Sequence, residues 1–436
     1  MFKKTAIIFS TALVCANAFA TEGVASDDIK AQIEDLKQQV ATLKQDMEAN
    51  QSTHEEITPL PDNEVIAPMT QGKLSNFLFS TLYEGAKPMG LLPGSQFPLG
   101  VLKQRNVYND YALIFSGYLQ ANAQYWHGSK INLNPKENKN EKTTYQSGKA
   151  IHLSTASLYT AANIDRYVTG ALVLSGNENT APNVKNAFVI FGNLDEYPVY
   201  ATVGKNRIAL GSFSGGGPWT LSLAGMLFRP GDATNASIAY YSHGLSTNIS
   251  VFQTNEHRSD FAAAAFYSGS IDDVNYGVNV GYVYDVNGTG QKSFEKAEKA
   301  GQRIGAVNVD VSLNYDIFGL GSGYAQTTNK WSNTNDRYAG AWYVQGWVSP
   351  SILGEPTNFS VSYHGAYNTA KIPVGLTGST VSGYKPSNTS VNKMVITSVQ
   401  RPFLTDNVLI GAEYVYMHIY NSEHTNAYTL NLSAYF

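Results

Sequence analysis

Few residues of this 436-residue chain are spaced for catalysis or for binding a metal ion. No H-E-x-x-H motif joins two of its histidines, which would otherwise suggest a zinc site, and no G-x-S-x-G motif presents a nucleophilic serine. The eight histidines are His54, His127, His152, His243, His257, His364, His418 and His424. The chain has one cysteine, Cys15, so no pair of thiolates is available. We therefore expect neither enzymatic activity nor a cofactor.

The chemistry that remains is the binding of anions by lysine and arginine. Residues 127–149 hold five lysines against two glutamates, and residues 287–303 hold three lysines and Arg303 against two glutamates. Arg207 and Arg229 bracket a third stretch, which is rich in glycine. Concentrated positive charge raises the local concentration of anionic solutes. The predicted ligand-binding residues are Lys130, Lys136, Lys139, Lys142, Arg207, Arg229, Lys292 and Lys296.

The first twenty residues predict a secretory signal peptide. Lys3 and Lys4 form its positive region, residues 5–14 are apolar, and Ala18-Phe19-Ala20 fits an A-x-A cleavage site. Cys15 lies inside this segment, so the mature chain would have no thiol. Attachment of a lipid to Cys15 is the alternative, which the bulky Val14 before it disfavours.

Three further segments precede the main part of the chain. In residues 26–50, apolar residues recur at spacings of three and four, which predicts a coiled coil and a homo-oligomer; the alternative is a solitary amphipathic helix. Residues 51–72 predict an extended linker. Residues 73–110 begin with a short amphipathic pattern, after which Pro88, Pro93 and Pro98 argue against regular structure. We expect residues 73–110 to form either a periplasmic collar or an insert in a pore.

From Tyr111 to the C-terminus, apolar and polar residues alternate with a period of two. Segments of about ten such residues, separated by turn residues, are typical of transmembrane β-barrels. The predicted strands, sixteen in all, are 111–126, 150–164, 167–177, 184–192, 198–206, 234–242, 246–254, 261–270, 275–286, 304–315, 320–329, 338–348, 358–368, 392–401, 407–419 and 425–436. The predicted fold class is therefore all-β, a 16-stranded antiparallel transmembrane β-barrel over residues 111–436 with an N-terminal periplasmic coiled-coil helix.

The connections between these strands predict how the barrel is oriented. Long ones (127–149, 207–233, 287–303 and 369–391) alternate with mostly short ones, and in such barrels the long loops are extracellular. We therefore expect the outer membrane of a Gram-negative bacterium, with lipid and lipopolysaccharide around the barrel and a periplasmic N-terminus. The last strand ends on Phe436, which resembles the signal that barrels present to the β-barrel assembly machinery.

Divided in this way, the loops carry opposite charges at the two ends. The extracellular connections sum to +6 and the periplasmic turns to −7, the latter through residues such as Asp195, Glu196, Asp272, Asp273, Glu355 and Asp406. The loop lysines either attract anionic solutes or neutralise the phosphates of lipopolysaccharide. With a pI of about 6.1, no basic domain for nucleic-acid binding is expected.

Sixteen strands leave an aqueous channel, which a loop or the N-terminal segment must narrow. We expect residues 207–233 to fold inwards, with Arg207 and Arg229 facing an opposing acid; a mobile surface loop is the alternative. No helix is expected after their glycines, which argues against a nucleotide site. Charges within strands should face the lumen or the rims, because a lysine or arginine facing lipid costs about 2–4 kcal/mol. The predicted pore-lining residues are Lys185, Lys205, Asp310 and Glu413.

The whole layout resembles the siderophore porin family typified by the legiobactin receptor. The most specific part is residues 186–213, with the turn Gly192-Asn193-Leu194-Asp195 and the later Gly211-Ser212-Phe213. The resemblance implies uptake of a ferric siderophore without the large plug of TonB-dependent receptors. Together with the basic loops it suggests an anionic carboxylate siderophore. A general diffusion porin and a structural protein linked to the periplasm by its coiled coil are the alternatives.

Overall fold

The computed structural model describes residues 38, 94–105, 112–135, 143–178, 180–253, 258–291, 293–294, 297, 301–331, 334, 336–375, 384–385, 388–420 and 423–435. The chain divides into two compact units, Met1–Glu64 and Val65–Phe436. In the first unit only Gln38, which is helical, is described. The predicted signal peptide, linker and nearly all of the predicted coiled coil therefore lie outside the described residues.

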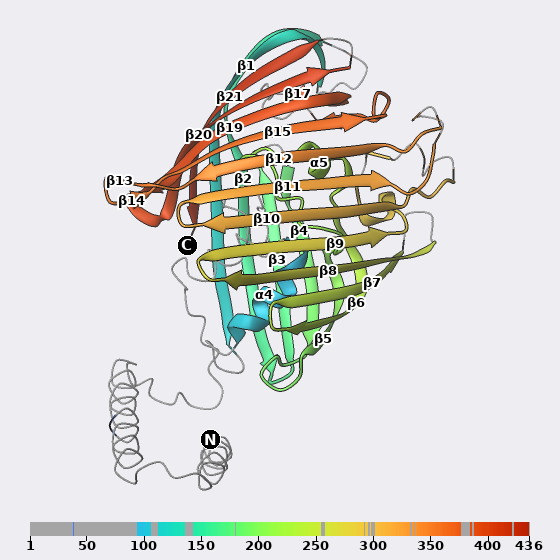
Figure 1. The fold of residues 1–436 in the computed structure, drawn as a ribbon, viewed down its shortest axis with the longest axis vertical. Helices are drawn as coiled ribbons and strands as arrows, with labels where there is room; N and C mark the ends of the chain where they lie inside the picture. Colours follow the sequence, from blue (N-terminus) through green and yellow to red (C-terminus); the bar gives the residue numbers. More distant parts are fainter. Residues whose placement is uncertain are drawn as a thin grey trace, which may run out of the picture. The chain divides into compact units, whose positions relative to one another are not determined.

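The second unit is an antiparallel β-barrel, and within its described residues sixteen strands follow one another around a closed wall (Figure 1). These strands are β1 (Leu113–Pro135), β2 (Thr143–Asp165), β3 (Val168–Asn177), β4 (Thr180–Phe191), β5 (Val199–Arg207), β6 (Asp232–Ser242), β7 (Leu245–Gln253), β8 (Ser259–Ile271), β9 (Val274–Val283), β10 (Ala306–Tyr315), β11 (Phe318–Thr327), β12 (Gly340–Val348), β15 (Asn358–Tyr367), β19 (Val391–Phe403), β20 (Thr405–Ile419) and β21 (His424–Tyr435). The barrel closes because β21 pairs with β1, from Tyr118 opposite Tyr435 to Gly128 opposite Thr425. The predicted fold class is confirmed.

The period-two pattern sorts side chains onto the two faces of the wall. On β10, Val309, Val311 and Leu313 are exposed on the outside, whereas Asp310 and its inward-facing neighbours are buried. The same division recurs around the barrel, with apolar residues outside and mostly polar ones within. Such an exterior suits lipid and such an interior suits water or polar inserts.

The two ends of the barrel differ in their connections. One end has mainly short turns, such as residues 166–167, 243–244 and 316–317, while the other carries the long connections 208–231, 284–305 and 368–390. We call these the short-turn end and the long-loop end. Three two-residue strands in the long connections, β16 (Val374–Gly375), β17 (Tyr384–Lys385) and β18 (Asn388–Thr389), and the hairpin of β13 (Ser351–Ile352) and β14 (Glu355–Pro356) complete the β-structure described.

One predicted loop is largely strand. Residues 127–149 were expected to be irregular, but β1 continues to Pro135 and β2 begins at Thr143, and the two pair up to Leu133 opposite Thr143. The prediction was wrong because this hairpin extends beyond the apolar band, where polar residues replace the alternating pattern.

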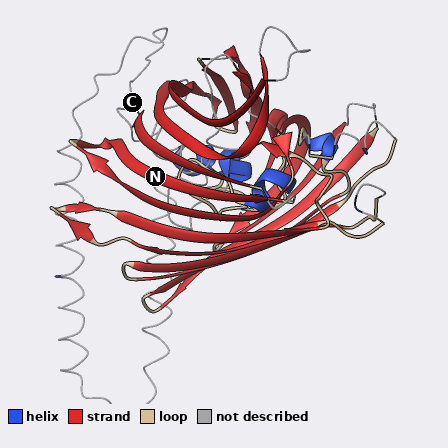
Figure 2. Ribbon diagram, turned by 90° about the horizontal axis from the view of Figure 1, so that it is seen from above, coloured by secondary structure: helices blue, strands red, loops and turns tan. Residues whose placement is uncertain are grey.

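Helical segments lie inside the ring of strands (Figure 2). The segment before the barrel forms a 3-10 turn, η1 (Gly94–Gln96), and a helix, α4 (Phe97–Gln104), and the connection between β5 and β6 contains the short helix α5 (Leu223–Phe228). A further 3-10 turn, η3 (Asn287–Thr289), follows β9. The expectation of no regular structure around Pro98 was wrong, because Pro98 lies in the first turn of α4. Backbone N–H groups in that turn make no hydrogen bond within the helix, so a proline there costs none.

Among the described residues, no helix combines the length and apolarity needed to cross a membrane.

Candidate functional site in the barrel lumen

The connection between β5 and β6 enters the lumen and is held there by the wall. Its tip is a tight turn in which Gly216 bridges to Leu221, and the Gly217 amide donates to the Thr220 carbonyl. Glu413, an inward-facing residue of β20, accepts hydrogen bonds from the amides of Trp219 (3.2 Å) and Thr220 (3.3 Å) and from the Thr220 hydroxyl. A Cβ at Gly217 would collide with the Glu413 carboxylate, so glycine is required for this approach.

A second carboxylate anchors the start of the same segment. Asp310 on β10 accepts a hydrogen bond from the Phe213 amide (3.2 Å) and another from the Tyr343 hydroxyl (2.7 Å). Gln345 on β12 donates to the Gly216 carbonyl at 2.8 Å. The inward fold predicted for residues 207–233 is therefore present, and its polar anchors come from inward positions of three strands.

Apolar packing fixes the rest of this lumenal segment. Ser222 caps α5 by accepting a hydrogen bond from the Gly225 amide (3.0 Å), and Leu223, Leu227 and Phe228 are buried. The helix after the glycines was not expected; six residues are too few to show a helical period, although a capping serine before an apolar run was a usable signal. A helix this short, capped by its own serine, gives no support to a nucleotide site.

The connection between β9 and β10 covers α5 from the long-loop end. Gln291 donates to the carbonyls of Met226 (3.1 Å) and Arg229 (3.2 Å), and the rings of Phe228 and Phe294 lie 5.5 Å apart. Asp285 joins the two ends of this connection by accepting hydrogen bonds from the amides of Asn287 and Ile304, both at 3.2 Å. Burial raises the pKa of Asp285 to about 6, against the opposing effect of those two amide donors.

A second insert packs against the inner wall near the short-turn end. Phe97, Leu99, Val101 and Leu102 of α4 are buried in one cluster with inward-facing residues of β1 to β6 and β20. The Phe97 ring meets Phe188 edge-on at 5.5 Å between centroids.

Polar contacts hold both ends of this helical insert. The Ser246 hydroxyl donates to the Gln96 side chain at 2.7 Å, and Arg105 donates to the Asp165 carbonyl at 2.7 Å. Of the two alternatives for residues 73–110, the described part therefore forms an insert in the lumen.

Three of the predicted basic residues are brought together at the long-loop end of β4, β5 and β6. Arg207 and Asp232 are opposite one another, with Nε 3.7 Å from Oδ1, and Lys185 interacts electrostatically with both and with Arg229. A β-bulge accounts for the position of Lys185: Val173 pairs with Asn186 and Leu174 with Val184, so Lys185 is the extra residue. Arg229 ends α5. We call these four side chains the basic cluster; together they carry a net charge of +2.

Arg207 was expected to face an opposing acid, and it does, although this acid is a neighbour on the wall and not a residue across the lumen. The carboxylate beside Arg207 is Asp232 on the adjacent strand, because the segment leaves the wall at Arg207 and returns at Asp232. The acids across the lumen, Asp310 and Glu413, accept hydrogen bonds from the backbone of the segment instead.

The other predicted residues lie apart from this cluster. Lys130 is exposed on the extension of β1, and Lys205 shares its face of β5 with the exposed Val203 and donates to the Val184 carbonyl at 2.8 Å. Lys136, Lys139, Lys142, Lys292 and Lys296 lie outside the described residues. Sequence reasoning missed Gln96, Thr220, Asp232 and Tyr343, because none of them belongs to a local motif.

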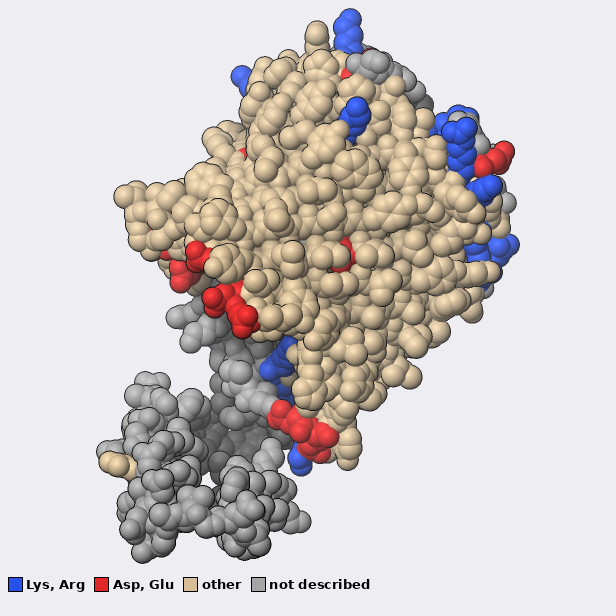
Figure 3. All heavy atoms as spheres, in the orientation of Figure 1, with Lys and Arg blue, Asp and Glu red and all other residues tan. Residues whose placement is uncertain are grey.

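Charge on the visible face divides between the two ends of the barrel. Lysines and arginines gather mostly at the long-loop end, and aspartates and glutamates at the short-turn end (Figure 3). Acids of the short turns include Asp195, Glu196, Asp272 and Asp273. In the part of the chain that the structure describes, no group of three or more His, Cys, Asp or Glu side chains is placed to hold a metal ion.

Comparison with known proteins identifies a family and a fold. A family model described as "Protein of unknown function (DUF3573)" matches residues 63–307, and no curated protein matches the chain significantly. Among solved structures, Salmonella typhi OmpF in complex with daunomycin aligns with a TM-score of 0.51 and 13% identity over 76% of this chain and 99% of that chain. The anion-selective porin from Comamonas acidovorans aligns with a TM-score of 0.48 and 8% identity over 75% of this chain and 100% of that chain. The likeness to OmpF shows a porin-like fold. None of these matches concerns the siderophore porin family, so a siderophore ligand remains a prediction.

Proposed function

The chain belongs to the DUF3573 family of proteins of unknown function, and we propose that it is a gated outer-membrane channel for anionic solutes carrying several charges. A ferric carboxylate siderophore is the solute class we infer. The observation that carries the proposal is the basic cluster of Lys185, Arg207, Arg229 and Asp232 at the point where the lumenal segment leaves the wall. An outside covered with apolar side chains supports the membrane location.

The basic cluster is placed to act on the lumenal segment as well as on a solute. Arg207 is the last residue of β5, Asp232 is the first residue of β6, and Arg229 caps the C-terminus of α5. An anion that binds several of these cations would neutralise charges both where the segment leaves β5 and where it returns to β6. Binding of the solute and displacement of the segment would then be coupled through shared residues.

The obstructed lumen favours a selective channel over a general diffusion porin. The segment between β5 and β6 is anchored to three strands, and α4 packs inside the lumen against β1 to β6 and β20. A general diffusion porin needs a permanently open path, whereas these inserts have to move before a large solute passes. The short-turn end would face the periplasm, as is usual for such barrels.

Flux through the purified protein in liposomes tests this function. Ferric citrate, a chelate of the inferred class, should enter faster than a neutral sugar of similar size. Arg207→Gln combined with Arg229→Gln should lower ferric citrate flux by about tenfold, because these cations concentrate the anion. The matched control is Arg166→Gln, a charge removed from a short turn, which should leave the flux unchanged. Equal entry of sugar and chelate, unaffected by either variant, would favour a general diffusion porin instead.

A further inference from the structure

Two neighbouring rows of outward-facing residues run across the strands around the closure of the barrel, the first over six strands and the second over five. In the first row, consecutive pairings join Phe359, Val399, Ala412, Leu430, Ala123 and Ile151. In the second, they join Thr397, Tyr414, Tyr428, Tyr125 and Lys149. Six strands span about 24 Å, since neighbouring strands lie about 4.8 Å apart.

The first row contains a hollow because two of its members are alanines. Ala123 and Ala412 flank Leu430, and together with the surrounding larger side chains they bound a cavity of about 970 Å³ that is open to the outside of the barrel. Leu430 and Ile151 are 64% and 85% exposed, so the hollow lies among side chains that face the lipid. Its surroundings suit an apolar chain.

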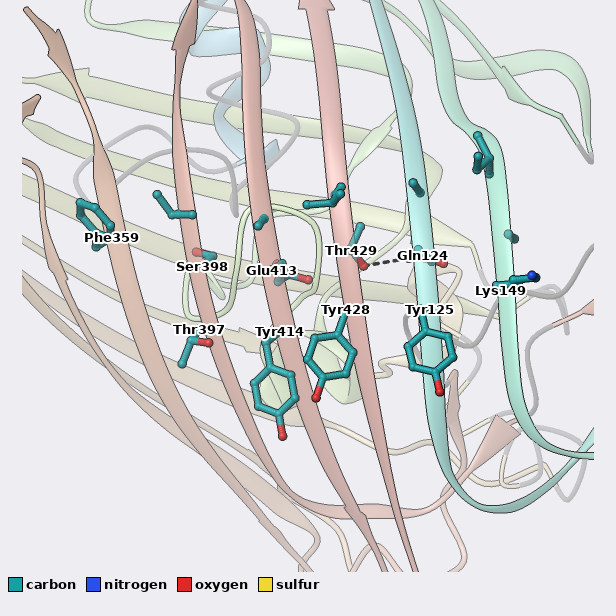
Figure 4. Close-up of a pocket in the computed structure, with 16 residues that line it drawn as sticks. Gln124, Tyr125, Lys149, Phe359, Thr397, Ser398, Glu413, Tyr414, Tyr428 and Thr429 are labelled. Carbon is teal, nitrogen blue, oxygen red and sulfur yellow. Dashed lines mark hydrogen bonds between the residues drawn. The ribbon is translucent and has the colours of Figure 1, made fainter. Parts of the chain in front are cut away.

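The second row is amphipathic. The rings of Tyr125, Tyr414 and Tyr428 lie side by side and point the same way (Figure 4). Tyr414 and Tyr428 are 5.1 Å apart between centroids, and Tyr428 stacks on Tyr125 at 6.3 Å. Lys149, directly opposite Tyr125 on β2, is exposed at the end of this row. Tyrosines with apolar bodies and polar tips are typical of the membrane interface.

The height of this row above the short-turn end matches the outer leaflet. From Leu113, the first residue of β1, Tyr125 is twelve residues further on. Twelve residues rise about 40 Å along a strand, or about 30 Å along the barrel axis at the usual tilt. An apolar band is about 25 Å tall, so Lys149 lies where the headgroups of outer-leaflet lipids begin.

We propose that this surface is a binding site for one outer-leaflet lipopolysaccharide. Lys149 pairs with a lipid A phosphate, the tyrosine hydroxyls lie among the sugar headgroup, and an acyl chain lies in the hollow beside Leu430, over Ala123 or Ala412. Charge complementarity supports this occupant, because the single cation stands at the headgroup end of an otherwise apolar site. The inference rests on the outer-membrane location proposed above but is independent of the solute.

Lipopolysaccharide that remains bound to the detergent-purified, full-length barrel provides the test, with native mass spectrometry to identify the lipid. Lys149→Gln should lower bound lipopolysaccharide by about fivefold, the loss expected for one lysine–headgroup contact. Ala123→Leu with Ala412→Leu, which fills the hollow, should lower it at least as much. The matched controls are Lys330→Gln, an exposed cation of the connection between β11 and β12, and Ala263→Leu with Ala265→Leu, two outward-facing alanines of β8. Both controls should bind as the unaltered protein does.

Each other outcome would overturn the proposal. Unchanged binding in Lys149→Gln and in Ala123→Leu with Ala412→Leu would mean that the lipid is not held at this site. An equal loss of bound lipid in the control variants would mean the same. Recovery of a phospholipid in place of lipopolysaccharide would mean that the site binds a different class of lipid. A change from oligomer to monomer at constant lipid would identify a second copy of the chain as the occupant. Resistance of each variant to unfolding in detergent at room temperature separates loss of the site from loss of the barrel. Solute flux is measured in parallel, so failure of the channel function is distinguished from failure of this site.

Discussion

The carboxylate of Glu413 on the barrel wall holds the backbone of Thr220 inside the lumen, with the Thr220 amide 3.3 Å from Oε2. The two residues are 193 positions apart in the chain. Through this contact, one inward-facing side chain of β20 determines where the tip of the lumenal segment lies. The position of the segment therefore depends on a few polar anchors, which can be removed one at a time.

Replacing this anchor should open the channel more often. In Glu413→Gln, an amide nitrogen, which cannot accept, replaces one of the two oxygens that accept from Trp219 and Thr220, and a buried donor left without an acceptor costs about 1–3 kcal/mol. That range corresponds to a roughly fivefold or greater increase in the population with a detached tip. Single-channel recording should show more frequent or larger openings, while Glu355→Gln in a short turn should behave as the unaltered protein. Identical recordings for both variants would contradict a gating role for the anchor.

Tethering α4 to the wall should close the channel. Gln96 and Ser246 are in contact, and the chain has no cysteine after Cys15, so Gln96→Cys with Ser246→Cys introduces the only thiols of the barrel. If α4 has to leave the lumen, oxidation should abolish ferric citrate flux and reduction should restore it. The two single-cysteine variants serve as controls. Full flux through the oxidised, cross-linked protein would mean that the solute passes beside α4.

Loosening the same insert should have the opposite effect. Phe97 is 3% exposed and packs on Phe188, and truncating a buried phenylalanine typically costs about 3–5 kcal/mol. Phe97→Ala should therefore raise the leak of small sugars through liposomes. Phe191→Ala removes a ring of the same size from the outside of β4, where it is 48% exposed, and should not change the leak. Equal leaks would show that packing of α4 does not limit passage.

The cover over α5 should loosen as the pH rises. The pKa of Asp285 is raised by burial from 3.8 to about 6, so the folded cover binds a proton more tightly than the unfolded chain does. Its stabilisation is complete below about pH 4, falls as the pH increases through 6 and then stays constant. Hydrogen exchange of the Asn287 and Ile304 amides should show this dependence relative to Asp285→Asn at each pH. Parallel pH profiles in the two proteins would refute the assignment.

Much of the wall was predictable because its physics is local. An alternating pattern such as Val309, Asp310, Val311 needs only a lipid on one side and water or polar groups on the other, and it was recognisable in all sixteen barrel strands. Strand ends were less predictable, as the extension of β1 and β2 shows, because pairing beyond the membrane does not require apolar residues.

The lumenal site was predictable only in part. Inward positions of Asp310 and Glu413 follow from the cost of a charge in lipid, but their partners depend on contacts between distant segments. Lys185 and Arg207 were recognised as charges, while their proximity needed the bulge in β4 and the pairing of β5 with β6. Pro98 misled because proline interrupts a helix from within but is favoured in the first turn of one.

The closure between β1 and β21 also sets the order of biogenesis. Eleven residue pairs, from Tyr118 with Tyr435 to Gly128 with Thr425, join the part of the barrel that leaves the ribosome first to the part that leaves it last. Until export of the final strand, both of these edges expose unpaired backbone groups, which are prone to aggregation. Removing the last strand should therefore leave the barrel unable to close, with the edge of β1 exposed to aggregation.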